Sequence, residues 1–360
     1  HPKFGRRKPY FFVGALFCSI ALFLYPFSKS LWMAAGLLWI LDAANNTAME
    51  PYRAFIADKL PASQQATGFL TQSFFTGLGI TLANVSLFIF QKNIHGNVGS
   101  IPYWVFGSFF LGSICSITSV SWSLYKTPEI PPTNEELYRL KHEKNNLLTP
   151  FIEIISAIKD MPKVMWQLAL VYLFQWYALF CYWQNASKSI ANSVWKTFIY
   201  QNNEAYEEAV GWTGLVNGWY NIVTFLSAFI LVGLAKKFSA KWVHTVCLFM
   251  AGIGLLIYPF IENKYLLFAP MTGFGIAWAS MMGIPYLLVV NQIPKERYGV
   301  YMGIINMMIV VPMILQTITF KYVLKFVLNE SPTKAIFFAG ILLLAAALAT
   351  LRIKKEEQPT

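Results

Sequence analysis

The sequence predicts an all-α membrane protein with many transmembrane helices. Of its 360 residues, 56% are hydrophobic and only 12% are charged, whereas about a quarter of the residues in a soluble domain are charged. Apolar stretches of about 20 residues recur along the whole chain, and this length matches a hydrocarbon core about 30 Å thick. Lipid offers backbone N–H and C=O groups no partners, so stretches this long and continuously apolar must be helices rather than barrel strands.

Ten stretches qualify as transmembrane helices, and Pro, Gly or charged residues bound them. The connections between them are short, apart from one long polar segment. The expected spans are residues 9–26, 31–56, 66–91, 102–124, 163–184, 210–235, 241–260, 265–290, 298–320 and 333–351.

The long polar segment, residues 125–162, contains a proline cluster from Pro128 to Pro132 and separates four spans from six. We interpret it as a cytoplasmic linker between an N-terminal bundle, 1–124, and a C-terminal six-helix bundle, 163–360. Similar basic loops at 5–8 and 236–241 suggest a repeat of six spans, in which the first half lacks its first two helices here. Paired halves with a solute site near the midplane are typical of secondary transporters.

The net charge of +11 arises from Lys and Arg residues in the loops between spans. They form no single basic face, so we expect no nucleic-acid partner. If residue 1 is cytoplasmic, most of the 28 Lys and Arg residues fall on the cytoplasmic side, as the positive-inside rule requires. We therefore expect a multi-pass protein of the plasma or inner membrane with both ends in the cytoplasm.

The second expected span carries the most informative polar residues. Asp42 lies about 16 Å into a span that starts near Leu31, roughly halfway across the hydrocarbon. A carboxylate there needs a partner, a water-filled cavity or a proton, so Asp42 is a candidate for proton coupling. The alternative is a structural Asp that is hydrogen-bonded to neighbouring helices.

Four more polar residues follow on the same helix. At about 100° per residue, Asn45, Asn46, Glu50 and Arg53 fall within about 140° of one another together with Asp42, which predicts one polar stripe facing a cavity. Glu50 is a second candidate for proton coupling. Arg53 could pair with it, or could extend its side chain to the cytoplasmic interface.

Amides and aromatic rings inside other spans suit a polyhydroxylated solute, which needs hydrogen-bond partners and flat apolar platforms. Most aromatic residues will be packing or interface residues. The candidate substrate-binding residues are Asp42, Asn45, Asn46, Arg53, Gln72, Gln175, Trp176, Asn217, Asn221 and Asn306.

Motifs for nucleotide or metal chemistry are missing from the sequence. It contains no Gly-x-x-x-x-Gly-Lys phosphate loop, no His-Glu-x-x-His and no Cys-x-x-Cys. All four cysteines fall within spans, where thiols mostly pack as small apolar groups. We expect no cofactor, no metal and no disulfide, and we expect a monomer.

The segment from Trp39 to Leu60 resembles the plant sucrose-proton symporters and their bacterial and animal relatives, of the glycoside-pentoside-hexuronide:cation symporter type, within the major facilitator superfamily. Similar stretches are Gly5 to Pro9, at the end of the family's cytoplasmic loop between its second and third helices, and Gly303 to Asn306 with Val311-Pro312. The matching residues of the main segment are Asp42, Ala44, Asn45, Asn46, Thr47, Pro51, Arg53, Ala54, Ala57 and Asp58.

This resemblance implies twelve helices, of which the first two are missing here, and proton-driven sugar uptake. It implies that Asp42 couples protons and contacts the sugar, that Arg53 interacts with substrate, and that Gly5, Arg6 and Arg7 belong to the cytoplasmic gating loop. The chain departs from the family at Glu50, where a small residue is expected, and it lacks an acidic residue around Gln184 to Ser187.

The expected function is therefore proton-coupled import of a sugar, an α-linked disaccharide such as maltose or sucrose, by alternating access. One alternative is a sugar sensor that binds without transporting. Another is a membrane-embedded glycosyl enzyme that uses Asp42 and Glu50 as paired carboxylates. Eight residues on one helix separate that pair by about 12 Å, which is too far without movement.

Overall fold

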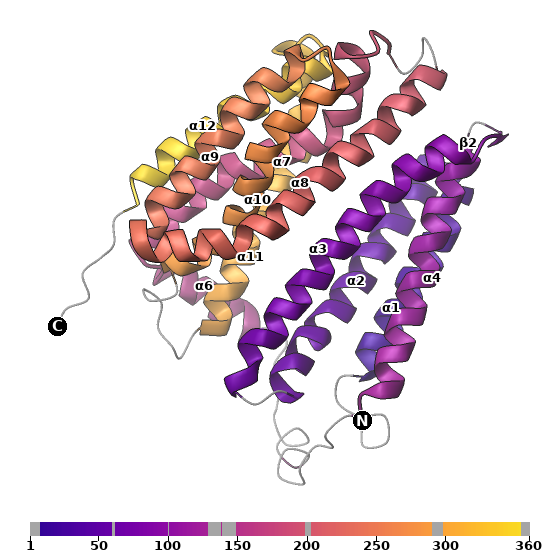
Figure 1. Cartoon of the computed structure of the whole chain (residues 1–360). Helices are drawn as coiled ribbons and strands as arrows, with labels where there is room; N and C mark the ends of the chain where they lie inside the picture. The colour runs from indigo at the N-terminus through magenta and orange to yellow at the C-terminus, as the bar shows by residue number, and fades with distance from the viewer. Residues whose placement is uncertain are drawn as a thin grey trace. The chain divides into compact units, whose positions relative to one another are not determined.

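The computed structural model describes residues 8–59, 62–99, 101–128, 138, 149–198, 203–289 and 298–353. These residues are almost entirely helical, as the sequence predicts, and Figure 1 shows long helices throughout. The packing of Cα atoms divides the chain into two compact units, residues 1–145 (unit 1) and 146–360 (unit 2). The predicted bundle limits, 1–124 and 163–360 with a linker at 125–162, stay a prediction.

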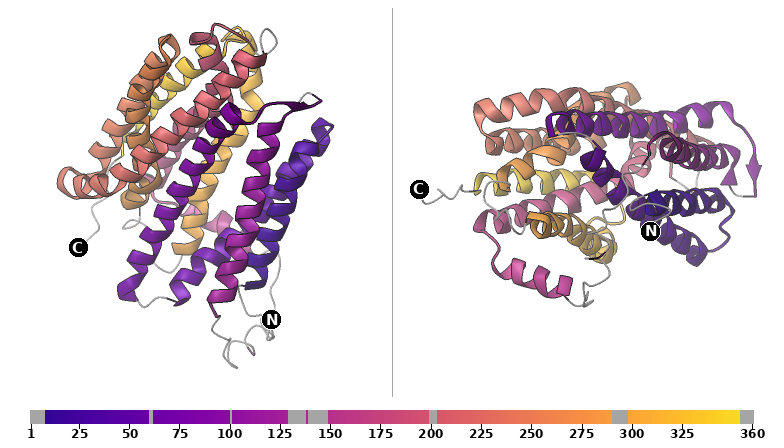
Figure 2. Two further views of the ribbon diagram at one scale, coloured as in Figure 1. Left: turned by 45° about the vertical axis from the view of Figure 1, so that its right-hand side comes forward. Right: turned by 90° about the horizontal axis from the view of Figure 1, so that it is seen from below.

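Unit 1 contains four long helices and a small hairpin. Helix α1 packs against α2 and α4, and α3 packs against α4 and α2. Both views in Figure 2 show the antiparallel hairpin projecting from the ends of α3 and α4. The elements are α1 (Lys8–Leu24), η1 (Tyr25–Phe27), α2 (Leu31–Lys59), α3 (Ala62–Asn93), β1 (Asn97–Val98), β2 (Ile101–Pro102) and α4 (Tyr103–Lys126).

Aromatic stacking and two polar contacts hold α4 against α1. Phe23 stacks on Phe110 with ring centroids 4.9 Å apart. The Ser113 hydroxyl donates to the Ser19 carbonyl over 2.7 Å, and Lys8 Nζ donates to the carbonyl at the far end of α4 over 2.9 Å. Each side chain donates a hydrogen bond to a backbone carbonyl oxygen, and lipid has no donor to compete for that oxygen. These bonds therefore hold α1 and α4 side by side.

Unit 2 is built around α7, which packs against α12, α11 and α8, while α9 packs against α10 and α12. The elements are α6 (Thr149–Lys159), α7 (Lys163–Ser193), α8 (Asn203–Phe238), α9 (Ala240–Ile257), η2 (Tyr258–Phe260), η3 (Lys264–Leu267), α10 (Phe268–Val289), α11 (Tyr298–Phe326) and α12 (Pro332–Leu351).

Ten of the helices in the described part of the chain correspond to the ten predicted spans. Counting only the residues that the structure describes, eight of them are long and apolar enough to cross a membrane, and α2 is not among the eight. In α2 the reason is the run from Asp42 to Thr47, whose four polar side chains lower the mean hydropathy. The same residues that suggested function therefore make α2 a weaker membrane segment.

Several helices continue beyond the predicted span ends. Helix α7 runs to Ser193, nine residues past the predicted end at 184, and α8 begins at Asn203 rather than at 210. Hydropathy reports where a segment leaves lipid, whereas backbone hydrogen bonding continues into water. Polar residues at the helix ends therefore extend the helix without extending the apolar span. Helix α6 has no counterpart among the predicted spans.

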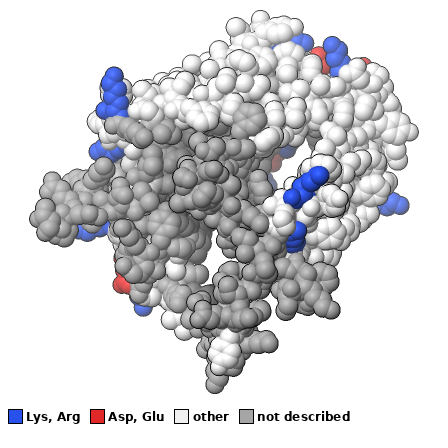
Figure 3. All heavy atoms as spheres, turned by 60° about the horizontal axis from the view of Figure 1, so that its bottom comes forward, with Lys and Arg blue, Asp and Glu red and all other residues white. Residues whose placement is uncertain are grey.

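The described surface is mostly uncharged. On the face seen in Figure 3, the blue Lys and Arg side chains lie in a few small groups, and most of the described surface there is white. All four cysteines, Cys18, Cys115, Cys181 and Cys247, are free thiols.

Candidate functional site

Helix α2 approaches α1 very closely at one glycine. A Cβ atom placed on Gly14 of α1 would lie 2.6 Å from the Ala44 carbonyl oxygen and 2.8 Å from the Ala48 Cβ. Glycine and alanine thus let the two helix backbones approach directly. Ala44 is buried in this contact, so the small-residue side of α2 is its packed side within unit 1.

The polar stripe lies on the other side of the same helix. At about 100° per residue, Ala44 and Ala48 lie about 200° and 240° around the helix from Asp42, whereas Asn46 lies only about 40° away. Asp42, Asn45 and Asn46 are all exposed, as this geometry requires. The Asn46 amide donates to the Asp42 carbonyl over 2.9 Å, which keeps its side-chain oxygen available.

An exposed carboxylate with two neighbouring amides is poorly suited to contact with hydrocarbon. An ionisable residue within a membrane helix normally faces protein or a water-filled cavity, because lipid cannot solvate its charge. The face carrying Asp42, Asn45 and Asn46 is therefore suited to exchange a proton and to hydrogen-bond hydroxyl groups.

Some candidates can be placed only by their position along a helix. Glu50 and Arg53 lie on α2, and Gln72 lies on α3. Their side chains lie outside the described part of the structure, as do residues Gly5, Arg6 and Arg7. The predicted roles of these six residues stay predictions.

The candidates on α7 lie inside unit 2. Gln175 is fully buried, and neither its amide oxygen nor its amide nitrogen has a hydrogen-bond partner among the described residues. Trp176 is also buried and meets Trp278 of α10 edge to face, with ring centroids 5.8 Å apart. Both side chains belong to the packed side of α7 rather than to its exposed side.

The two α8 candidates form a short hydrogen-bonded chain with α7. The Tyr182 hydroxyl donates to Asn217 Oδ1 over 2.8 Å, and the Asn221 amide donates to the Asn217 carbonyl over 2.8 Å. Asn221 is buried and Asn217 is partly exposed. Asn306 of α11, by contrast, is exposed, so it is the most accessible of the candidate ligands placed in unit 2.

Sequence reasoning missed a reciprocal amide pair between α7 and α11. Gln316 Nε2 donates to Gln184 Oε1 over 3.0 Å, and Gln184 Nε2 donates to Gln316 Oε1 over 3.4 Å. One to two turns away, the Tyr177 and Thr319 hydroxyls share a hydrogen bond of 2.8 Å. Gln184 is the last residue of a predicted span, and hydropathy gives no sign of its partner on another helix.

No cluster of three or more His, Cys, Asp or Glu residues that could hold a metal ion occurs within the described ranges. The accessible candidate groups are instead one carboxylate and several amides, which suit protons and hydroxyl groups.

The Major Facilitator Superfamily model matches residues 3–317 of the chain. The chain belongs to this superfamily. It is thus a multi-pass membrane transporter rather than an enzyme, and the glycosyl-enzyme alternative is not retained.

Within the superfamily, the chain is distantly related to plant sucrose transport proteins. It is 20% identical over 380 residues to sucrose transport protein SUT5 of Oryza sativa subsp. japonica, covering 88% of this chain and 69% of that protein. It is 22% identical over 385 residues to sucrose transport protein SUC4 of Arabidopsis thaliana, covering 88% and 70%.

Solved transporter structures share the fold. A POT family transporter crystallised with 5-aminolevulinic acid superposes with a TM-score of 0.64 at 14% identity, covering 97% of this chain and 82% of that one. A bacterial homologue of the human lysosomal transporter Spinster gives a TM-score of 0.59 at 14% identity, covering 96% and 82%. These likenesses establish the all-α major facilitator fold.

Proposed function

We propose that this transporter imports an α-linked disaccharide, such as maltose or sucrose, together with protons by alternating access. The observation that carries the proposal is the polar face of α2. Because Gly14 packs on Ala44 and Ala48, the face with Asp42, Asn45 and Asn46 stays open. The relationship to plant sucrose transport proteins supports a sugar as the solute.

In this proposal Asp42 binds the coupling proton and Glu50 assists it. A carboxyl group within a membrane changes its proton affinity when its surroundings alternate between water and protein. Coupling follows if sugar binding and protonation stabilise the same conformation. Amides beside the carboxyl group would bind sugar hydroxyls, because each amide both donates and accepts hydrogen bonds.

Except for Arg53 of α2, the remaining predicted sugar ligands come from other helices, and they differ in accessibility. Asn306 and Asn217 have exposed or partly exposed side chains, whereas Gln175, Trp176 and Asn221 are buried in unit 2. We propose that the buried residues shape the site and that the accessible ones contact sugar. Arg53 and Gln72 complete the proposed set.

The proposal also covers the membrane in which the transporter works and its oligomeric state. The transporter works as a monomer in the plasma or inner membrane, with both ends of the chain in the cytoplasm. The two bundles, 1–124 and 163–360, move as separate bodies joined by the linker, and Gly5, Arg6 and Arg7 belong to the cytoplasmic gate.

The decisive experiment is uptake of radiolabelled maltose and sucrose into proteoliposomes, with and without an inward proton gradient. The wild type should accumulate one of these sugars only with the gradient. Asp42→Asn should still bind sugar but lose gradient-driven accumulation. Glu204→Gln is the matched control, because Glu204 is an exposed carboxylate in the first turn of α8.

Three results would count against the proposal. Accumulation driven by a sodium gradient alone would show that sodium, and not the proton, is the coupling ion. Unimpaired accumulation by Asp42→Asn would show that Asp42 does not bind the coupling proton. Sugar binding without any flux in the wild type would favour the non-transporting sensor.

A further inference from the structure

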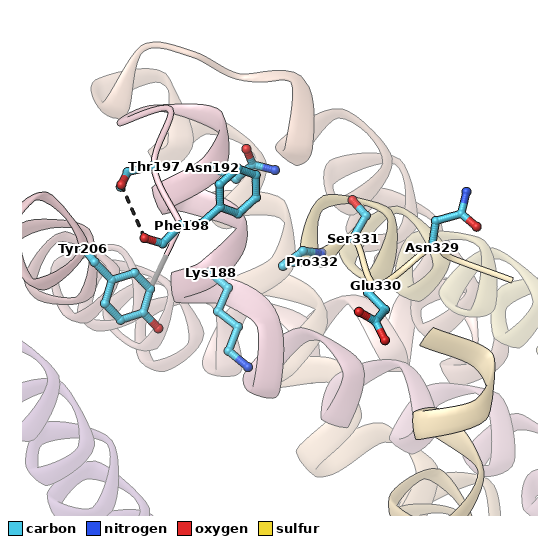
Figure 4. Close-up of a pocket in the computed structure, with 9 residues that line it drawn as sticks. All are labelled: Lys188, Asn192, Thr197, Phe198, Tyr206, Asn329, Glu330, Ser331 and Pro332. Atoms are coloured by element: carbon cyan, nitrogen blue, oxygen red, sulfur yellow. Dashed lines mark hydrogen bonds between the residues drawn. The ribbon is translucent and has the colours of Figure 1, made fainter. Parts of the chain in front are cut away.

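A cavity of about 370 Å³ lies at one end of unit 2, where the end of α7, the start of α8 and the turn between α11 and α12 meet (Figure 4). It is at the opposite end of α7 from α6. None of the candidate sugar ligands lines it. The lining residues are Lys188, Asn192, Thr197, Phe198, Tyr206, Asn329, Glu330, Ser331 and Pro332.

Two charged groups from different elements line this cavity. Lys188 comes from α7 and Glu330 from the α11–α12 turn, and both are exposed. Neither side chain forms an ion pair with another of the described residues. A cation and an anion that are not paired with these residues are available to a ligand, and together they add no net charge.

The turn that carries Glu330 is held in an uncommon backbone conformation. Asn329 and Glu330 have φ angles of 53° and 56°, a left-handed region that residues other than glycine seldom adopt. The Glu330 N–H donates to the Leu324 carbonyl over 2.8 Å, and the Ser331 hydroxyl accepts from the Lys334 N–H and caps α12. Strain of this kind tends to occur where a side chain is held for function.

The α7 side of the cavity is equally fixed. The Asn192 amide donates to the Thr333 hydroxyl of α12 over 3.0 Å. The Asn192 side-chain oxygen is not used in this bond and can accept a further hydrogen bond. The Phe198 ring is 47% exposed and offers a flat apolar surface at the cavity edge.

We propose that this cavity is a second saccharide site, separate from the polar face of α2. Its volume lies in the lower range of small-molecule sites and suits one sugar ring or a disaccharide. Charged and amide groups bind adjacent hydroxyls, and an aromatic ring covers the C–H face of a sugar. The balanced charge favours a neutral polyol. The sugar identity rests on the proposed function, but the site itself does not.

The test is protection of an introduced thiol by sugar. Ser331→Cys, made in a full-length chain whose four native cysteines are replaced by serine or alanine, places a near-isosteric thiol in the cavity. A water-soluble maleimide then measures the accessibility of that thiol in the solubilised protein. At a maltose concentration of about ten times Kd, one-site binding slows labelling about tenfold. Ser30→Cys is the matched control, because Ser30 also accepts a hydrogen bond from the backbone N–H three residues later and is exposed outside the cavity.

Second substitutions in Ser331→Cys identify the groups that hold the sugar. Lys188→Gln and Glu330→Gln should each abolish protection, whereas Lys334→Gln and Glu204→Gln should retain it. Equilibrium dialysis with radiolabelled maltose, run in parallel, should give two sugars per wild-type chain and one per Glu330→Gln chain.

The outcomes separate this proposal from the proposed function. Sugar binding without protection of Ser331→Cys overturns the second site and leaves sugar transport standing. Protection without gradient-driven uptake supports the second site and overturns the symport. Protection by glycine betaine but not by sugar overturns the saccharide class in favour of a zwitterion, and no sugar binding at all overturns both proposals.

Discussion

A Cβ atom on Gly14 would lie 2.6 Å from the carbonyl oxygen of Ala44, so α1 and α2 approach as closely as a glycine permits. Gly14→Ala should force the helices apart at a cost of about 1–3 kcal/mol, because the obstructing atom is backbone. We expect a lower thermal unfolding midpoint in detergent and weaker sugar uptake, since the polar face of α2 would turn.

Gly36 of α2 provides the control, because a Cβ atom there would meet nothing within 4 Å. Gly36→Ala should be neutral or stabilise the protein by about 0.5–1 kcal/mol, as alanine favours a helix. Equal losses for both substitutions would show that helix contact is not the cause.

The Gln184–Gln316 pair should couple α7 to α11. A double-mutant cycle with Gln184→Leu and Gln316→Leu should give a coupling free energy of about 0.6–2 kcal/mol, the range for polar contacts between membrane helices. Thr317→Val is the control, because the Thr317 hydroxyl donates to the Met313 carbonyl of its own helix and to no other helix among the described residues. A Gln184–Thr317 coupling as large as the Gln184–Gln316 coupling would refute the pair.

Lys264 is held by aromatic rings at the end of unit 2. Its Nζ lies 4.7 Å from the Trp212 ring centroid and 5.6 Å from that of Trp195, and 3.6 Å from Glu208 Oε1. Lys264→Met should lower the free energy of unfolding by about 0.5–1 kcal/mol, measured by thermal unfolding. Lys264→Arg should retain most of the stability.

Lys325 offers a comparison for that substitution, since its Nζ lies 5.5 Å from the single ring of Phe326 and it is exposed. Lys325→Met should change stability less than Lys264→Met does. The reverse order would show that the ring cluster around Lys264 does not stabilise the protein.

The ion pair between Lys196 and Glu262 predicts a pH dependence. The hydrogen bond from Lys196 at 2.6 Å, and then its charge, hold the pKa of Glu262 below its ordinary value of 4.5. A lowered folded-state pKa contributes stability above the ordinary pKa, and this contribution is lost as pH falls through the lowered value. Wild type should therefore exceed Glu262→Gln in thermal stability at pH 7, and the difference should vanish in acid.

The effect will be small, because both side chains are largely exposed. Salt should weaken it at pH 7, as expected for surface charges. A difference between wild type and Glu262→Gln that grows as pH falls would contradict the assignment.

Much of the fold could be predicted from the sequence, because a chain in lipid can satisfy its backbone hydrogen bonds only in helices or closed barrels. The ten predicted spans each correspond to a helix, and the angular spacing of Asp42, Asn45 and Asn46 predicted one polar stripe. Hydropathy could not locate helix ends, so α7 and α8 proved longer than expected. It also could not detect α6, which is too short to cross a membrane.

The sites were less predictable, because polarity shows that a side chain needs a partner but not which partner. Gln175 and Asn306 looked alike in sequence, yet one is buried in unit 2 and the other is exposed. The Gln184–Gln316 pair joins residues 132 positions apart, and the left-handed turn at Asn329 leaves no periodic signal. Such features depend on tertiary packing.

The weak apolarity of α2 has a consequence for biosynthesis. A translocon releases segments into lipid according to their hydrophobicity, and Asp near the centre of a segment opposes release by about 2.5–3.5 kcal/mol. The neighbouring α1 is strongly apolar and already fits α2 through Gly14. We expect α1 and α2 to insert into the bilayer together as one helical hairpin. A substitution that lowers the hydrophobicity of α1 should therefore also hold α2 back in the translocon.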